Sequence, residues 1–266
     1  MIAVICGLAI STAASAQTPT VNWTGFYIGG HGGYQWSTVD LGFEKELPGL
    51  GDGVSLNTDG AMGGIHGGVQ QQFGNFVIGI ELSGDWGNGD GSAAGEWGPV
   101  GKIICGFGCF GFEAEGAENV SVDIDSLFLA TARTGYAWQN ILVYAKGGFA
   151  SAEIGTGASL IGEAEFCVFG CLPFEWNASG STEKRHNGFA LGGGIDWMIW
   201  QNVSVGLDYT YVNLSSETHR GTLNGDVDFC GKCGFDFAKD YKIKVDPDDI
   251  HYVNARLTFH FNSASP

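Results

Sequence analysis

The sequence predicts an all-β protein: an eight-stranded antiparallel up-and-down transmembrane β-barrel with long outer loops. Three observations predict this fold. Segments of about ten residues alternate apolar with polar side chains, short turns alternate with long polar connections, and the charged residues inside the alternating segments keep to the polar face. No stretch reaches the roughly 20 uninterrupted apolar residues of a membrane-spanning helix, so any crossing of a membrane must be made by strands.

Composition agrees with this class and excludes others. Glycine accounts for 45 of 266 residues and aromatic residues for 13%, whereas charged residues make up only 15%. Soluble domains carry about 25% charged residues, so this surface is poor in charge for contact with water. A net charge of −17 with only 12 basic residues argues against nucleic acid as a partner, because phosphates are bound by clusters of lysine and arginine.

The N-terminal residues 1–16 predict a signal peptide. They contain no charge, hold an apolar run over residues 2–10, and end on Ala14, Ser15 and Ala16, the small residues that signal peptidases recognise. Cleavage before Gln17 would leave residues 17–266 as one outer-membrane barrel domain. The basic segment that usually opens a signal peptide is missing, which leaves the true translation start open.

The first four predicted strands cover residues 25–36, 61–72, 76–86 and 122–137. The third is the clearest, with Phe76, Ile78 and Ile80 on one face and Glu81 and Asp85 on the other. The short sequence 73–75 is typical of a tight turn between the second and third strands.

The last four predicted strands cover residues 142–150, 188–198, 203–212 and 251–261. Their alternation is equally regular: Val203, Val205 and Leu207 lie opposite in phase to Ser204 and Asp208. The sequences 138–140 and 200–202 predict two more tight turns. Three short turns therefore alternate with four long connections, as in outer-membrane barrels.

Charged residues test this assignment, because lysine or arginine facing lipid near the midplane costs roughly 2 to 4 kcal/mol. Only six acids and three bases lie within the predicted strands, leaving 23 acids and nine bases for the long connections. The nine strand residues all share the polar phase of their strand: Glu81, Asp85, Asp123, Asp125, Arg133, Lys146, Asp196, Asp208 and Arg256. An eight-stranded barrel is filled by its own side chains, so we expect no wide pore.

We expect the lumen to hold a paired charge network around its three bases. Its predicted members are Glu81, Asp85, Arg133, Lys146, Asp196, Asp208 and Arg256. Aromatic residues should mark the two membrane–water interfaces, with tryptophans 138, 197 and 200 at the short turns and Tyr34, Trp36, Trp86 and Tyr211 where the long connections begin.

Several strand sequences resemble one known family. Residues 22–30, Asn-Trp-Thr-Gly-Phe-Tyr-Ile-Gly-Gly, resemble the opening strand of the small, porin-like RopB-type outer-membrane barrels of alphaproteobacteria. Residues 72–81, 131–137 and 142–148 are similar to that family's second hairpin, fourth strand and fifth strand. Residues 208–211 and 256–261 are similar to its last two strands.

The resemblance covers the strands and not the loops. It implies an eight-stranded barrel that is assembled into the bacterial outer membrane by the barrel-assembly machinery, and it implies no enzymatic chemistry. Two features depart from the family pattern: residues 262–266 follow Phe261, where family members end on an aromatic residue, and the loops contain cysteine pairs.

Removal of the signal peptide would remove Cys6 and leave six cysteines in three close pairs. The pairs are Cys105 and Cys109, Cys167 and Cys171, and Cys230 and Cys233, one in each of the last three long connections. An even number suits an oxidising compartment, and we interpret them as disulfides, either within each loop or between loops among 15 possible connectivities.

Two sharper interpretations of the cysteines stay open. Thiolates at such spacing bind zinc, although oxidation would remove the ligands and no histidine is paired with them locally. The sequence Cys230-Gly-Lys-Cys233 also matches a redox C-x-x-C motif, but it lacks the strand-to-helix setting that activates such a thiol.

The histidines offer the main enzymatic alternative. Some small outer-membrane barrels modify lipid A with serine and histidine at the outer rim, and His186, His219 and His251 are candidates for that position. We interpret the other three, His31, His66 and His260, as lumen or interface residues. No triad spacing supports an enzyme, so we predict no catalytic residue, no cofactor and no metal site.

The sequence thus favours a structural outer-membrane protein that supports envelope integrity and presents acidic loops. A lipid A-modifying enzyme and a narrow porin are the alternatives. The expected partners are outer-membrane lipid and lipopolysaccharide, contacted through divalent cations that the acids hold, for instance at Asp246, Asp248 and Asp249.

Overall fold

The computed structural model describes residues 21–47, 49–106, 108–168, 171–228 and 233–262. The predicted signal peptide, residues 1–16, lies outside the described residues. No helix in the described ranges is long and apolar enough to cross a membrane. The described chain forms ten strands: β1 Gly25–Leu47, β2 Gly51–Phe73, β3 Phe76–Cys105, β4 Cys109–Trp138, β5 Ile141–Val168, β6 Cys171–Trp200, β7 Val203–Leu214, β8 Glu217–Asp228, β9 Gly234–Pro247 and β10 Ile250–Asn262.

Eight of these strands pair in a closed cycle. Neighbours along the chain pair antiparallel from β1 to β7, β7 pairs with β10, and β10 pairs with β1 from Gly25↔Asn262 to Trp36↔His251. We call this part the closed ring. Three tight turns, at residues 73–76, 138–141 and 200–203, lie at one of its ends, which we call the turn end. The eight predicted strands all lie within the closed ring.

The prediction of long outer loops was wrong. The long connections continue as strands, so that β3, β4 and β6 each reach 30 residues, and the fourth connection adds the hairpin β8–β9. Pairing explains this: backbone N–H and C=O groups that leave the ring stay hydrogen-bonded when neighbouring strands simply run on. The strand count among the described residues is therefore ten instead of eight.

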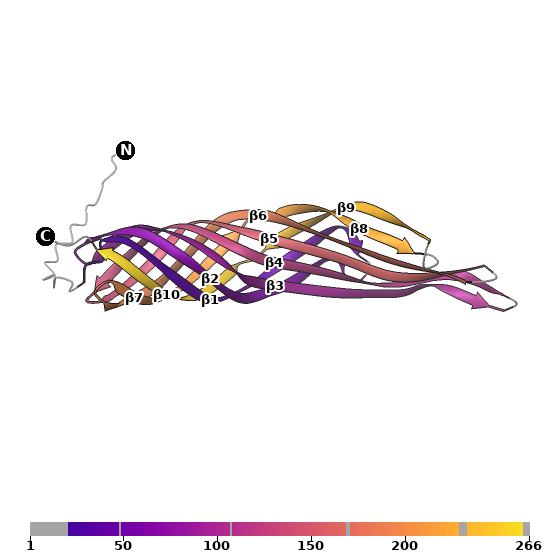
Figure 1. The fold of residues 1–266 in the computed structure, drawn as a ribbon, viewed down its shortest axis with the longest axis horizontal. Helices are drawn as coiled ribbons and strands as arrows, with labels where there is room; N and C mark the ends of the chain where they lie inside the picture. Colours follow the sequence, from indigo (N-terminus) through magenta and orange to yellow (C-terminus); the bar gives the residue numbers. More distant parts are fainter. Residues whose placement is uncertain (1–20, 48, 107, 169–170, 229–232, 263–266) are drawn as a thin grey trace, which may run out of the picture.

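The strands beyond the ring form an extension in which β8 and β9 replace β7 and β10. β9 pairs with the outer part of β1, and β8 pairs with β6 from Glu175↔Asp228 to Ser179↔Asn224. Figure 1 shows the result as one elongated body in which β3 to β6 run almost its full length, past the ends of β1, β2 and the β8–β9 hairpin. We call the far end of the extension the hairpin end.

Burial separates the outer surface of the ring from its lumen. Large apolar side chains point outward along every strand of the ring, with exposed fractions from 42% for Val253 to 65% for Leu207 and 67% for Phe26. This belt is: Phe26, Ile28, Ile65, Phe76, Ile78, Ile80, Leu82, Phe128, Val143, Phe149, Phe189, Leu191, Ile195, Leu207, Val253, Leu257, Phe259 and Phe261. The predicted interfacial aromatics, such as Trp138, Trp86 and Trp36, are exposed at its two edges.

The interior is layered along its axis. Trp23, Val77, Leu142 and Met198 belong to an apolar cluster at the turn end. Polar side chains fill the middle of the ring. A larger apolar cluster follows at the boundary with the extension: Val39, Leu41, Leu56, Met62, Val120, Val122, Ile124, Leu127, Leu129, Ala150, Ala152, Ile154, Ala190, Val212, Leu214, Ile243, Val245, Ile250 and Tyr252.

A β-bulge corrects the predicted orientation of two acids. Asp123 and Asp125 share the phase of Arg133 in the sequence, which placed them in the lumen. The register of β4 against β5 shifts between Ile124 and Ser126, so Asp123 and Asp125 are exposed on the outside while Arg133 is buried inside. One extra residue in a strand reverses the faces of everything beyond it.

Candidate functional site

A charge network fills the middle of the lumen. Arg133 of β4 contacts Glu81 of β3 at 3.1 Å and Asp196 of β6 at 2.9 Å. Arg256 of β10 contacts the same Glu81 at 2.6 Å and Asp208 of β7 at 3.4 Å.

Lys146 of β5 completes the network, with Nζ 2.8 Å from Asp208. Three bases thus face three acids from six strands, and each of these side chains is at most 5% exposed. A buried ion keeps its charge only when it is paired and hydrogen-bonded, so the equal numbers of acids and bases are what allow this cluster to be dry.

Two tyrosines that the sequence reasoning did not single out hold the network in place. Tyr27 donates to Glu81 at 2.9 Å, and Tyr144 donates to Asp208 at 2.8 Å while its ring lies 3.8 Å from the Arg133 guanidinium carbon. A side chain at Gly68 or Gly194 would come within 2.5 Å or 2.7 Å of these hydroxyl oxygens, so both glycines make room for the rings. Both tyrosines share the polar phase of their strands, which was the signal available in the sequence.

Asp85 lies in the lumen but outside this network. Its carboxylate contacts His31 Nε2 at 2.5 Å, His31 Nδ1 is 2.9 Å from His66 Nδ1, and His66 Nε2 is 2.9 Å from the hydroxyl of Thr258. This series of side-chain contacts therefore links β3, β1, β2 and β10 across the lumen. His31, His66 and His260 all lie inside the ring, as the sequence analysis expected.

Two of the three predicted rim histidines lie away from the outer rim. His186 of β6 and His219 of β8 are buried inside the extension, with their Nε2 atoms 2.9 Å apart. His186 Nδ1 also contacts the carbonyl oxygen of Ser215 at 2.9 Å, and His219 Nδ1 lies 3.2 Å from the hydroxyl of Thr156. Burial, together with the neighbouring His186, lowers the pKa of His219 to about 4.

His251 is the one predicted rim histidine on the outer surface. Its ring stacks on Trp36 with 5.5 Å between centroids, and Nδ1 lies 2.8 Å from the Tyr209 hydroxyl. It belongs to the aromatic edge of the belt and not to a catalytic arrangement.

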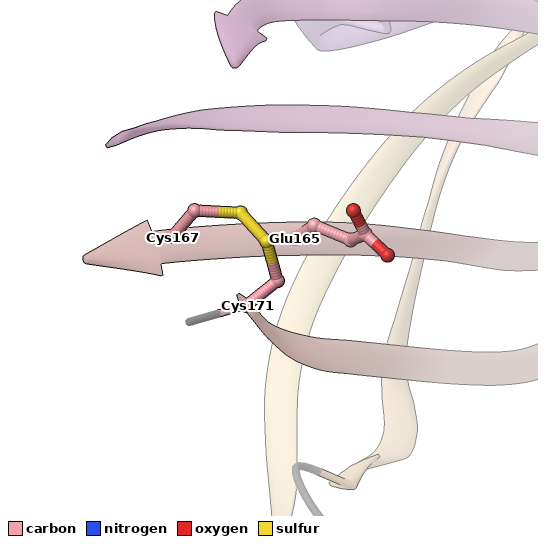
Figure 2. A group of neighbouring side chains, drawn as sticks. All are labelled: Glu165, Cys167 and Cys171. Atoms are coloured by element: carbon pink, nitrogen blue, oxygen red, sulfur yellow. A yellow bond between two sulfur atoms is a disulfide. The ribbon is translucent and has the colours of Figure 1, made fainter. Parts of the chain in front are cut away.

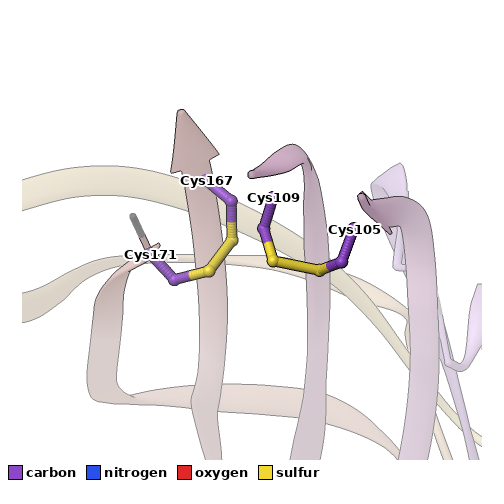
Figure 3. The surroundings of a disulfide bond; sticks show 4 residues. All are labelled: Cys105, Cys109, Cys167 and Cys171. Atoms are coloured by element: carbon purple, nitrogen blue, oxygen red, sulfur yellow. A yellow bond between two sulfur atoms is a disulfide. The ribbon is translucent and has the colours of Figure 1, made fainter. Parts of the chain in front are cut away.

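The cysteines close the tips of the hairpins. Cys105 and Cys109 form a disulfide at the β3–β4 tip, and Cys167 and Cys171 form another at the β5–β6 tip. Figure 3 shows these two disulfides side by side on neighbouring hairpins. Cys233 is also disulfide-bonded, while Cys230 lies outside the described residues.

Only one group of possible metal ligands occurs in the described ranges, and its chemistry does not suit a metal. It comprises Glu165, Cys167 and Cys171, which Figure 2 shows at the β5–β6 tip. The disulfide between the two cysteines removes both thiolates, and one carboxylate is left.

The outward face of the extension is acidic. Glu115, Glu163, Glu175 and Asp228 lie directly opposite one another on β4, β5, β6 and β8, and Glu113 faces Glu165 in the next row. Like charges in opposite positions on paired strands repel each other. The backbone hydrogen bonds must therefore hold these strands together against the repulsion within this row of acids. The sequence analysis had placed these acids in loops.

Comparison with known proteins identifies the family. A family model described as the outer membrane protein beta-barrel domain matches residues 2–257. The chain belongs to this family. The 31 kDa outer-membrane immunogenic proteins of Brucella melitensis and Brucella suis are each 26% identical to this outer-membrane barrel protein over 214 residues, which cover 77% of this chain and 76% of theirs.

Solved structures similar to this outer-membrane barrel protein include one from Pseudomonas aeruginosa and one from Yersinia pestis. OprG of Pseudomonas aeruginosa has 12% identity and a TM-score of 0.42, over 91% of this chain and 99% of its own. The attachment invasion locus protein Ail of Yersinia pestis has 10% identity and a TM-score of 0.30, over 89% and 99%.

Proposed function

We propose that the chain is a non-conducting, eight-stranded transmembrane barrel that supports the outer membrane and holds a rigid acidic sheet outside it. The membrane-spanning segments are residues 25–36, 61–73, 76–86, 126–138, 141–151, 188–200, 203–213 and 251–261. The apolar belt supports this assignment. Each segment is long enough, because a tilted strand needs only roughly 9 to 11 residues to cross the hydrocarbon core.

The filled lumen is the observation that carries the proposal. Arg133 is 4% exposed and Arg256 5%, so water reaches very little of either side chain at their level of the lumen. Apolar clusters lie on both sides of the charge network. A porin lumen, in contrast, is lined by hydrated polar side chains.

Conductance of the purified protein in planar bilayers tests this proposal. We expect no conductance steps above baseline, with a general porin reconstituted in parallel as the positive control. Discrete channel openings would support the narrow-porin alternative and overturn the sealed-lumen proposal.

We further propose lipopolysaccharide as a partner, contacted through divalent cations. Asp59, Asp90 and Asp123 lie opposite one another on β2, β3 and β4, just beyond the edge of the belt at Trp86. Burial raises the pKa of Asp123 most, and the nearby carboxylates of Asp125 and Asp90 add to the shift. A divalent cation would relieve the repulsion among these carboxylates.

Binding of the protein in nanodiscs to lipopolysaccharide micelles, with Mg²⁺ or with excess chelator, tests this partner. We expect binding that requires Mg²⁺ and is weakened by Asp90→Asn, with Glu163→Gln as a control acid far from the membrane. Equal binding with and without Mg²⁺ would contradict the proposal. Insertion by the barrel-assembly machinery belongs to the same proposal, and depletion of that machinery should abolish the folded form.

The buried positions of His186 and His219 support a non-enzymatic role, since neither side chain faces lipid. Lipid A mass spectrometry with and without the gene tests the enzymatic alternative, and a changed acyl pattern would favour it. The Brucella relatives are named as immunogenic. The acidic sheet of this chain is the part that we expect antibodies to contact.

A further inference from the structure

A cavity of about 340 Å³ lies in the extension, between β1, β4, β5, β8 and β9. Its volume falls in the range of sites for small molecules. Most of its lining is apolar and includes Phe43, Leu47, Val120, Leu223, Tyr241 and Ile243.

The cavity contains a buried carboxylate with a free acceptor. Glu118 is 1% exposed, and its Oε1 atom accepts a hydrogen bond from the Gly49 N–H at 2.8 Å. Its Oε2 atom has no partner among the described residues, and neither does the buried hydroxyl of Tyr241. Buried polar atoms in folded proteins are almost always hydrogen-bonded, so a free acceptor on a residue that lines an apolar cavity points to a ligand that donates to it.

The mouth of the cavity indicates that this donor is uncharged. Lys45, Lys239 and Lys242 border it; Lys242 is paired with Glu44 at 3.0 Å, whereas Lys45 and Lys239 form no ion pair within the described ranges. Glu44 and Asp240 also border the cavity, so together with Glu118 its lining carries three acids and three bases, and no net negative charge draws a cation in. A hydroxyl group therefore fits better than an ammonium group.

An apolar cluster separates the cavity from the closed ring. The apolar cluster of Val39, Leu41, Val122 and Ile124 lies between it and the lumen of the ring. A molecule that enters is bound and not passed on, which makes this site independent of any conductance of the barrel.

We propose that this cavity binds a small, mainly hydrocarbon molecule with one neutral hydroxyl group, of the alkylphenol type, whose hydroxyl donates to Oε2 of Glu118. Aromatic side chains at positions 43 and 241 favour a ring in the body of the ligand. The proposal adds a ligand site outside the membrane to the structural role proposed above.

Binding of 4-ethylphenol and 4-ethylanisole to the full-length protein in nanodiscs tests the proposal, since the methyl ether keeps the apolar body and lacks the donor. By isothermal titration we expect 4-ethylphenol to bind roughly tenfold tighter than the ether. Glu118→Leu should abolish this preference, and Ala158→Trp, which fills the cavity, should abolish binding of both. Glu163→Gln, on the outward face, should leave both affinities unchanged.

Equal affinity for the two compounds, or an unchanged preference in Glu118→Leu, would overturn the proposal. Tighter binding of the cation 4-methylbenzylammonium than of 4-ethylphenol would overturn the assignment of a neutral donor. If Ala158→Trp does not give the folded, heat-modifiable form on gels, Glu118→Leu, which is similar in size to the native residue, decides alone.

Discussion

Glu81 is the residue on which the lumen network depends most, because both buried arginines contact it. Glu81→Ala would leave Arg133 and Arg256 with unbalanced positive charge in a dry interior. We expect a loss of about 3 to 5 kcal/mol in the free energy of unfolding, measured by urea titration of the protein in lipid vesicles. The outward Glu163→Gln should change it by less than about 0.5 kcal/mol; comparable effects of the two variants would contradict a dry network.

The contact between His186 and His219 makes the extension sensitive to acid. A histidine in the unfolded chain titrates near 6.5, and because the folded pKa of His219 is lowered to about 4, the unfolded form binds more protons in between. The packing of β8 against β6 should therefore be most stable above pH 6.5. Its stability should fall as the pH drops below 6.5 and reach its lowest value below about pH 4.

Hydrogen exchange of β8 amides at pH 7 and pH 5, corrected for the intrinsic rate, measures this effect. We expect a weakening on the order of 1 kcal/mol at pH 5, which His219→Asn should remove. The pair Lys184–Glu217 lies nearby, and the hydrogen bond from Lys184 lowers the pKa of Glu217. Its contribution to stability is therefore complete above the ordinary glutamate pKa and is lost only as the pH falls below it, so it adds little to a difference between pH 7 and pH 5. Exchange that is unchanged between the two pH values would exclude the histidine contact as the cause.

Single residues were predictable from the sequence where strict alternation held. The phase of β3, β5 and β10 placed Glu81, Lys146 and Arg256 in the lumen, and that is where they lie. Alternation failed for Asp123 and Asp125, because a bulge adds one residue and nothing in the local residue types marks it. The pairing of His186 with His219 depends on the placement of β8 beside β6, which no local pattern encodes.

At the scale of elements, the disulfides should stabilise the hairpin tips and not the barrel. The Cys105–Cys109 bond closes a very short loop, for which loss of chain entropy predicts a stabilisation of about 2 kcal/mol. We expect Cys105→Ser/Cys109→Ser to speed proteolytic cleavage at the β3–β4 tip and to leave the heat-modifiable gel shift of the barrel unchanged. A loss of that shift would indicate that tip and barrel unfold together.

The ring strands were predictable as elements and the extension was not. In the ring, large apolar residues such as Phe76 and Ile80 alternate with polar ones. In the extension the alternation persists: the side chains at positions 114, 116 and 118 point inward, and Glu113 and Glu115 point outward. Because these residues are small or charged, the sequence looks like that of a polar loop. Glycine, alanine and glutamate have low β-strand propensity, but the backbone hydrogen bonds that continue between neighbouring strands outweigh this preference.

For the whole molecule, the β8–β9 hairpin should be separable from the closed ring. Replacing residues 215–247 by a short turn would preserve the pairing of β10 with both β7 and β1, but it would expose Val39 and Leu41, whose part of β1 now pairs with β9. We expect the variant to insert and to show the gel shift, with a free energy of unfolding lowered by several kcal/mol from the lost apolar burial. Failure to insert at all would show that the hairpin is required to build the ring.

The position of Arg256 on β10, which pairs with β1, gives the charge network a role in the closure of the ring during folding. Arg256 comes from β10, which follows the other strands of the closed ring in the chain, while its partner Glu81 comes from β3 and Asp208 from β7. Until β10 meets β1, an incomplete sheet would carry excess negative charge along a wet inner wall, and that charge would hold water and keep the two edges apart. When Arg256 enters the lumen, its guanidinium neutralises this negative charge and the water is released. We therefore expect pairing of β10 with β1 to be cooperative, and the ring to resist opening at that pair of strands.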